Sequence, residues 1–141
     1  MRTFATGATR DTDVGKYDFE GFCSPLAIER FAEYMHKNRV QADGSIRDAD
    51  NWQKGIPIVA YMKSAYRHFM AVWKTYRLFY LGAGDPDEFS RRVEDDLCAL
   101  KFNVDGMLHE VVRERLSRSA GKPVRTVPAL PDPPKPRKRR R

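Results

Sequence analysis

The sequence predicts an all-α fold, in which three to four helices form a small bundle. Apolar residues recur at spacings of three and four over long stretches, which is the pattern of a helix with one buried face. Turns join these stretches, and no alternating strand pattern of similar length interrupts them. Because so few helices make a thin bundle, we expect oligomerisation to complete it.

The first helix is predicted to begin after Ser24. The Ser24 side chain can cap the unpaired amides of a helix, and Pro25 suits the first helical position. A core face follows at helical spacing, formed by Ile28, Phe31, Ala32 and Met35.

The second helix is predicted to run from Pro57 to about Leu81, where Gly82 and Gly84 end it. Its apolar residues form one broad stripe, which we expect to face the core. The stripe consists of Ile58, Met62, Ala65, Phe69, Val72, Trp73 and Tyr76.

The third helix has the strongest start signal, D-P-D-E from Asp85 to Glu88. It combines a capping aspartate, a proline at the first position and an acidic residue whose charge interacts favourably with the helix dipole. Apolar residues continue to about Leu116. Gly106 lies within this stretch, and we expect it to bend or divide the helix.

Charge and proline divide the 141-residue chain into three parts. Residues 119–141 hold the whole net charge of +7 and most of the prolines, so we predict a disordered basic tail there. The all-α domain is expected at residues 23–118, which follow an N-terminal arm at residues 1–22. In that arm, aromatic residues between charges and glycines are typical of a segment that packs across a neighbour.

The composition excludes several classes of protein. Two cysteines, Cys23 and Cys98, are too few for a disulfide framework and indicate reduced thiols in a cytoplasmic protein. The charged first 22 residues do not resemble a secretory signal. No uncharged apolar run approaches the length of a membrane span, so we expect no membrane partner.

Acidic residues on two predicted helices are candidates for binding a hard cation. Glu29, Glu33 and His36 are spaced four and three apart, which places them on one stripe beside the apolar face. The third helix carries Glu94, Asp95 and Asp96 in succession. Carboxylates from different helices can hold Mg²⁺ or Mn²⁺ against phosphates. The alternative is that each group is simply a solvated helix face.

His68 and Arg67 lie at the margin of the apolar stripe on the second helix. A histidine in this position can serve as a ligand or a base, but it is more often a part-buried structural residue. The arginine is open to the same two interpretations, because long cationic side chains often cover apolar surface.

Five segments occur together in the order seen in a phage-encoded family. The chain resembles the dATP/dGTP diphosphohydrolase N-terminal domain, the MazZ-like proteins, which are akin to all-α MazG-type nucleotide pyrophosphohydrolases. The resemblance covers about Thr6 to Glu110, and the N-W-x-K-G block is its best marker. The segments are R-D-T-D-V-G-K-Y-D-F-E-G-F, P-L-A-I-E-R-F-A-E-Y-M, D-N-W-Q-K-G-I-P, Y-R-H-F-M and L-K-F-N-V-D-G-M-L-H-E.

The resemblance implies a Mg²⁺- or Mn²⁺-dependent cut between the α and β phosphates of a purine deoxynucleoside triphosphate, in the cytoplasm of a phage host. MazG-type relatives hold the metal with an E-x-x-E and an E-x-x-D pair. This chain departs from both, because His36 follows Glu33 at the second position and Glu94-Asp95-Asp96 stands in place of the later pair. The metal ligands expected here are Glu29, Glu33, Asp95 and Asp96.

The remaining site residues follow from the same resemblance. Glu33 and His68 are expected to be catalytic, with His68 orienting or deprotonating a water or hydrogen-bonding a phosphate. Lys54 and Arg67 are expected to hold the triphosphate, and Trp52 to contact the base or plug the end of the bundle. The expected substrate-binding residues are Asn51, Trp52, Lys54, Arg67 and Asn103.

An alternative function is a non-enzymatic phage accessory protein that binds nucleic acid or another protein. The basic cluster at residues 135–141 could make sequence-independent phosphate contacts. Residues 1–118 have balanced charge, whereas a folded nucleic-acid module should carry a basic stripe. The charge distribution therefore favours a small anionic ligand.

Overall fold

The computed structural model of the protein describes residues 1–82 and 85–121, which belong to two compact units. The first unit spans residues 1–49 and the second begins at residue 50. The prediction of an all-α fold is confirmed, because four α-helices and one two-stranded sheet make up the regular structure of the described residues. From residue 122 onward, the predicted disordered tail lies outside the described residues.

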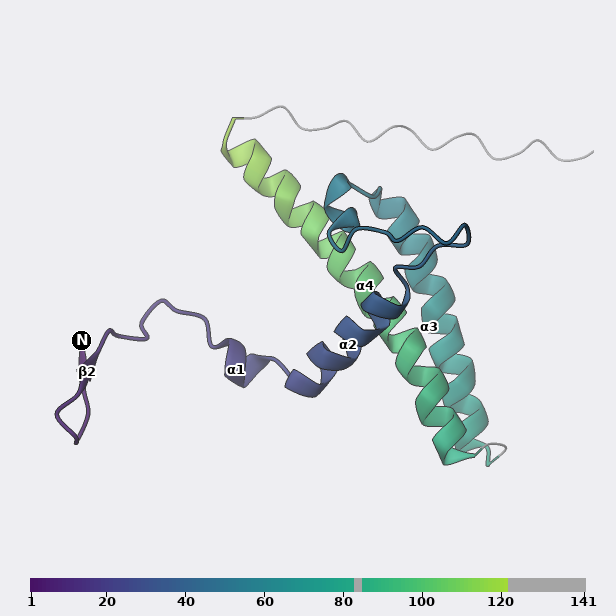
Figure 1. The fold of residues 1–141 in the computed structure, drawn as a ribbon, viewed down its shortest axis with the longest axis horizontal. Helices are drawn as coiled ribbons and strands as arrows, with labels where there is room; N and C mark the ends of the chain where they lie inside the picture. The colour runs from purple at the N-terminus through teal and green to yellow at the C-terminus, as the bar shows by residue number, and fades with distance from the viewer. Residues whose placement is uncertain (83–84, 122–141) are drawn as a thin grey trace, which may run out of the picture. The chain divides into compact units, whose positions relative to one another are not determined.

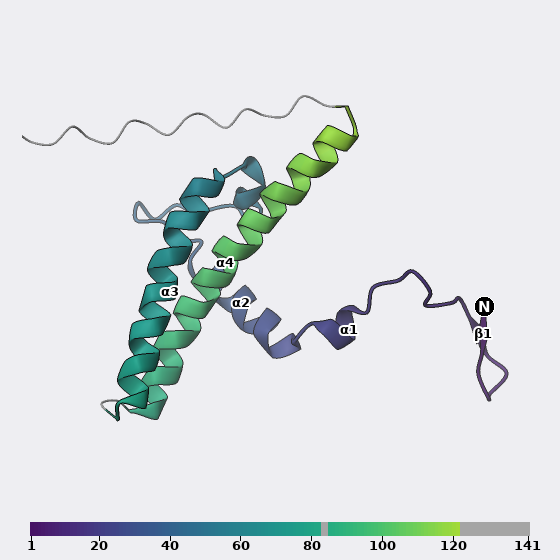
Figure 2. The ribbon, with the colours of Figure 1, turned by 180° about the vertical axis from the view of Figure 1, so that it is seen from behind.

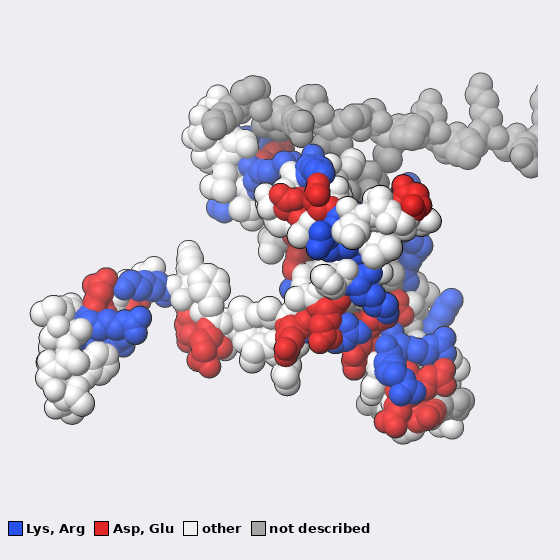
Figure 3. All heavy atoms as spheres, in the orientation of Figure 1, with Lys and Arg blue, Asp and Glu red and all other residues white. Residues whose placement is uncertain are grey.

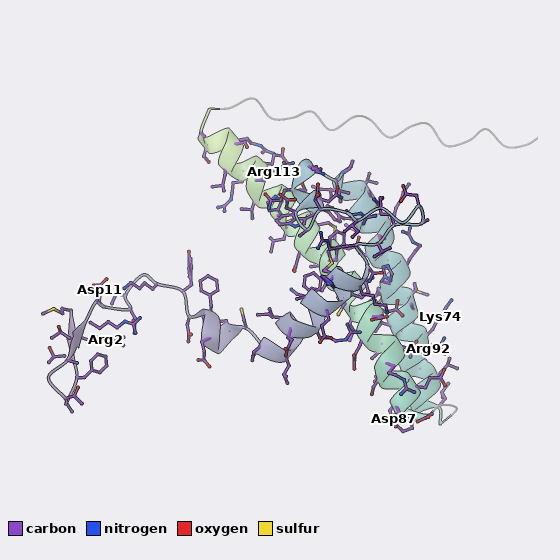
Figure 4. The ribbon with its side chains drawn as sticks, in the orientation of Figure 1. Arg2, Asp11, Lys74, Asp87, Arg92 and Arg113 are labelled. Atoms are coloured by element: carbon purple, nitrogen blue, oxygen red, sulfur yellow. The ribbon has the colours of Figure 1, made fainter. Side chains whose placement is uncertain are left out.

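The first unit begins with a small hairpin that the sequence analysis did not predict. Strands β1 (Arg2–Thr3) and β2 (Thr9–Arg10) pair in antiparallel fashion. Ion pairs join Arg2 to Asp13 and Lys16 to Asp11; Arg2 and Asp11 are labelled in Figure 4. Two-residue strands are too short to give an alternating apolar pattern, so the sequence carried no strand signal.

Helix α1 (Phe19–Phe22) is a single turn, and helix α2 (Pro25–Lys37) follows it. The predicted start of α2 is confirmed, because the Ser24 hydroxyl accepts a hydrogen bond from the amide of Ala27 at 3.3 Å. On its apolar face Phe31 and Met35 are half-buried, whereas Ile28 is 52% exposed.

The second unit is a helical hairpin preceded by a short 3₁₀ helix. The 3₁₀ helix η1 covers Asn51–Lys54, α3 covers Ile58–Tyr80 and α4 covers Pro86–Ser119. In Figures 1 and 2, α3 and α4 run side by side in opposite directions. The predicted cap of α4 is confirmed, because the Asp85 carboxylate accepts from the amide of Asp87 at 2.9 Å.

The core of the hairpin is small. Two aromatic contacts join α3 to α4: the rings of Tyr61 and Phe102 lie 5.8 Å apart, and those of Phe79 and Phe89 stack at 4.5 Å. The buried apolar residues of the described chain are Tyr61, Ala65, Cys98 and Ala99. One neighbouring helix therefore covers only a narrow strip of α3.

The expectation that the whole apolar stripe of α3 faces the core is wrong. Its larger members remain between 43% and 51% exposed, because the contact with α4 is made by residues that precede them, such as Tyr61 and His68. Ala65 is the stripe member that is buried. The exposed members are Met62, Phe69, Trp73 and Tyr76.

Gly106 does not divide α4, which continues through it without interruption. Instead it lies against the ring of Tyr61. A Cβ added at Gly106 would lie 2.3 Å from the Cε1 and Cζ atoms of that ring. The glycine therefore serves close helix packing rather than a kink.

Near the turn of the hairpin, Figure 3 shows Lys and Arg side chains mixed with Asp and Glu side chains. Figure 4 labels Lys74 of α3 and Asp87 and Arg92 of α4 in the half of the hairpin that ends at this turn. Among the described residues, no helix combines the length and apolar composition that a membrane crossing requires.

Candidate active site

The structure brings together two of the predicted site residues, His68 of α3 and Asp96 of α4. The Nδ1 atom of His68 lies 3.1 Å from the Oδ1 atom of Asp96. The two side chains are 32% and 28% exposed, so the pair is accessible from solvent but not fully hydrated. Two residues distant in sequence thus form one contact across the hairpin.

This contact indicates which ring nitrogen of His68 carries a hydrogen. A carboxylate only accepts hydrogen bonds, so the Nδ1 atom of His68 must carry the hydrogen. In the neutral ring the Nε2 atom is then the proton acceptor. Asp96 therefore orients the imidazole in the manner required of a general base.

Arg67 and Asp95 lie on one side of the hairpin. Arg67 precedes His68 by one residue, and Asp95 precedes Asp96 by one residue. One residue is a rotation of about 100° around a helix. Because α3 and α4 run in opposite directions, these two rotations bring Arg67 and Asp95 to the same face of the hairpin. We call the face that carries Arg67 and Asp95 the polar face; there Arg67 is exposed and Asp95 is half-buried.

The N-W-Q-K segment forms η1, in which Asn51 and Trp52 are half-buried and Lys54 is exposed. The indole of Trp52 meets the ring of His109 edge to face, with centroids 4.5 Å apart. Sequence reasoning did not single out His109, although it belongs to the L-K-F-N-V-D-G-M-L-H-E segment. Nothing in its spacing along α4 indicated that an indole would contact it.

Asn103, predicted to bind substrate, is 4% exposed. Its Nδ2 atom donates a hydrogen bond of 2.7 Å to the carbonyl of Ala99, one turn earlier in α4. The buried amide of Asn103 is thus hydrogen-bonded within α4 and has a structural role in the hairpin core.

Glu29 and Glu33, predicted as metal ligands, lie exposed on α2 in the first unit. Asp95 and Asp96 lie half-buried on α4 in the second unit. Within residues 1–82 and 85–121, no three His, Cys, Asp or Glu side chains are grouped so that they could hold a metal ion.

A second polar cluster, missed by the sequence analysis, surrounds Tyr61. The Tyr61 hydroxyl and the Oε1 atom of Glu110 are both buried without a hydrogen-bond partner. Burial raises the pKa of the Tyr61 hydroxyl, the charge of Glu110 raises it further, and Arg113 opposes the shift. Arg113 forms an ion pair with Glu110. The available signal was Gly106, an isolated glycine in a long helix one turn before Glu110.

Replacing Tyr61 by phenylalanine is expected to leave the free energy of unfolding at pH 7 unchanged or higher, because it removes a buried hydroxyl that lacks a partner. A raised folded-state pKa favours the neutral phenol. Its contribution to stability is therefore complete below the unfolded pKa of about 10 and is lost as the pH rises through the higher folded value. Urea unfolding at pH 7 and pH 11 measures both effects.

Tyr66 provides the control for this substitution, because it lies on the same helix and is 65% exposed. Tyr66→Phe should retain the alkaline loss of stability that Tyr61→Phe reduces. A Tyr61→Phe protein that is clearly less stable at pH 7 would mean that the hydroxyl has a partner after all.

A small hollow near the turn of the hairpin contains none of the predicted site residues. An ion pair at 3.2 Å between Glu88 and Arg92 lies at its rim. Its lining consists of Thr75, Leu78, Phe79, Asp85, Glu88, Phe89 and Arg92. Because its lining carries two carboxylates and a single cation, it does not resemble a triphosphate site.

The chain matches no protein-family model, no curated protein and no solved structure at a significant level.

Proposed function

We propose that the protein hydrolyses purine deoxynucleoside triphosphates to the monophosphate and pyrophosphate, with Mg²⁺ or Mn²⁺ as cofactor. The observation that carries the proposal is the His68–Asp96 contact of 3.1 Å. It joins His68, a position taken from the family resemblance, to Asp96, which was expected to bind metal, and it gives the geometry of an oriented base.

In the proposed reaction, Asp96 accepts from the Nδ1–H group of His68 and holds the ring in place. The Nε2 atom of His68 takes a proton from water as the water oxygen bonds to the α phosphorus. The bond between the α phosphorus and the oxygen that bridges to the β phosphorus breaks, and pyrophosphate leaves with that electron pair. Arg67, with its planar set of donors, suits two oxygens of the triphosphate.

Mg²⁺ is commonly bound by one or two carboxylates, with phosphate and water oxygens completing its shell. Asp95, which lies on the polar face with Arg67, would hold the cation in this way, while Asp96 contacts His68. When bound, the metal neutralises phosphate charge. We assign no step to Glu29 or Glu33, which belong to the first unit.

A panel of nucleotides tests the proposal. Purified protein incubated with Mg²⁺ or Mn²⁺ and each deoxynucleoside triphosphate should release pyrophosphate and the monophosphate, identified by mass, and EDTA should stop the release. A chain truncated after Ser119 should keep this activity, because the proposal requires no residue of the basic tail. Absence of hydrolysis with every nucleotide over a range of pH would leave the alternative of an accessory protein.

Replacing Lys54 by alanine is expected to raise the KM for nucleotide by about tenfold, the loss of one charge-assisted contact to phosphate. The kcat should change little, since the lysine binds substrate and transition state alike. Steady-state kinetics measure both constants. Lys63→Ala, a change at an exposed lysine of α3, is the matched control and should leave the KM as it was. If the two variants had the same KM and kcat, Lys54 would not bind the nucleotide, and η1 would only connect α2 to α3.

A further inference from the structure

Polar residues recur along the contact between α3 and α4. On α4, Asp96, Asn103 and Glu110 follow one another at intervals of seven, so they share one stripe of the helix. On α3, Tyr61 and His68 are also seven residues apart, and each contacts α4. Two helices that only bury apolar surface against each other carry apolar residues at such positions. Packing alone therefore does not explain this polar row.

The end of the row at Tyr61 and Glu110 lacks hydrogen-bond partners. Among the described residues, none pairs with the Tyr61 hydroxyl or with the Oε1 atom of Glu110, and both atoms are buried. The Oε2 atom of Glu110 accepts from Arg113. An unpartnered buried polar group costs free energy, and native proteins rarely leave two in one cluster. A ligand that hydrogen-bonds to both atoms would remove this cost.

The two unpartnered atoms lie at the same level of the hairpin. The Tyr61 hydroxyl is 2.8 Å from the position that a Cβ atom on Gly106 would take. Glu110 is one turn beyond Gly106, and helix side chains tilt back toward the N-terminus, so the Glu110 carboxylate reaches toward the same turn. Besides burial, the charge of Glu110 raises the pKa of the Tyr61 hydroxyl, as expected of a neighbouring group. One ligand can therefore contact both atoms.

The chemistry of these atoms defines the ligand. As a carboxylate, Glu110 only accepts hydrogen bonds, so its Oε1 atom requires an N–H or O–H donor. The Tyr61 hydroxyl can donate to an acceptor beside that donor. Adenine has both on one edge, an amino group next to a ring nitrogen. Guanine differs, because its two neighbouring N–H groups suit both oxygens of a carboxylate, and Arg113 already holds one of them.

Aromatic rings at this end of the hairpin suit a flat base. The rings of Tyr61 and Phe102 lie 5.8 Å apart. The indole of Trp52 contacts His109, the residue before Glu110, with ring centroids 4.5 Å apart. Bases stack on side chains of these types. The same end of the hairpin thus combines apolar rings with two unsatisfied polar atoms.

We propose that Tyr61 and Glu110 recognise the adenine edge of a bound nucleotide. The amino group donates to the Oε1 atom of Glu110, and the Tyr61 hydroxyl donates to the neighbouring ring nitrogen. This base site rests on the proposed function, whose purine substrate it narrows to adenine nucleotides. Tyr61 and His68 are separated by about 10 Å of helix, close to the distance from the α phosphate to the base in a nucleotide. Because both unpartnered atoms are shielded from solvent, the indole of Trp52 moves away from His109 as the base enters.

Isothermal titration calorimetry with the α,β-methylene analogues of dATP and dGTP, in the presence of Mg²⁺, tests the proposal without hydrolysis. The unchanged protein should bind the dATP analogue at least about tenfold more tightly than the dGTP analogue. Tyr61→Phe should weaken binding of the dATP analogue about tenfold, although it does not destabilise the free protein. Glu110→Gln should reverse the preference, because Arg113 keeps the amide oxygen and the amide nitrogen then donates to the guanine carbonyl.

Tyr66→Phe and Glu114→Gln are the matched controls, since Tyr66 is an exposed tyrosine of α3 and Glu114 also pairs with an arginine. Both should bind the analogues like the unchanged protein. If circular dichroism shows that Glu110→Gln does not fold, Tyr61→Phe alone decides. The expected binding pattern without pyrophosphate release would support the base site and reject the reaction.

Pyrophosphate release with unchanged binding in the Tyr61 and Glu110 variants would overturn the base site alone, as expected if only a water molecule fills it. Failure of the unchanged protein to bind either analogue would overturn the base site together with the proposed function.

Discussion

Replacement of Asp96 by asparagine is expected to lower the kcat for nucleotide hydrolysis by about 100- to 10,000-fold, the range that general base catalysis contributes. The carboxylate can only accept from the Nδ1–H group of His68, whereas an amide can also donate and so stabilise the other tautomer. The KM should change less than the kcat. Pyrophosphate release under saturating nucleotide measures the effect.

The control for this change is Asp105→Asn, on the same helix but exposed and paired with Lys101. It should hydrolyse nucleotide like the unchanged protein. His68→Gln should match Asp96→Asn in its loss, and the double variant should lose little more, because the two residues act as one unit. Full activity in Asp96→Asn would remove the oriented base from the mechanism.

Gly106→Val is expected to reduce the free energy of unfolding by about 3 kcal/mol, at the upper end of the cost of overpacking a core. An added Cβ would lie 2.3 Å from two carbons of the Tyr61 ring. That ring is 2% exposed, so moving it away from the added side chain would disturb the residues packed around it. Urea unfolding followed by circular dichroism measures the change.

Valine also has a lower helix propensity than most residues, so the control is Asp105→Val at the neighbouring, exposed position. It should cost well under 1 kcal/mol. In a Tyr61→Ala background, Gly106→Val should cost much less than in the native chain, because the clashing ring is absent. An equal cost in both backgrounds would attribute the loss to the backbone instead of the ring.

The helix boundaries could be predicted because their signals are local. Ser24 with Pro25, and Asp85 with Pro86, lie next to the amides that they cap or precede, so a few residues determine where α2 and α4 begin. The β1–β2 hairpin lacked such a signal. The role of Gly106 could not be predicted either, since it depends on a ring from another helix.

The candidate site was predictable in its parts but not in its pairing. His68 and Asp96 are each recognisable as residues with useful chemistry, but their contact depends on the register between α3 and α4. The broad apolar stripe of α3 also could not be assigned to the core from sequence alone. Spacing identifies Phe69 and Trp73 as apolar helix positions, but it cannot tell a core position from one that stays about half exposed in the folded hairpin.

The unequal lengths of the two long helices have a consequence for local unfolding. Helix α4 has 34 residues and α3 has 23. Since Tyr61, near the start of α3, lies level with Gly106, the last turns of α4 extend beyond α3. They depend on their own backbone ladder and on ion pairs such as that of Glu114 with Arg118. This end can therefore fray while the hairpin stays closed, and it is the end that leads into the basic C-terminal sequence.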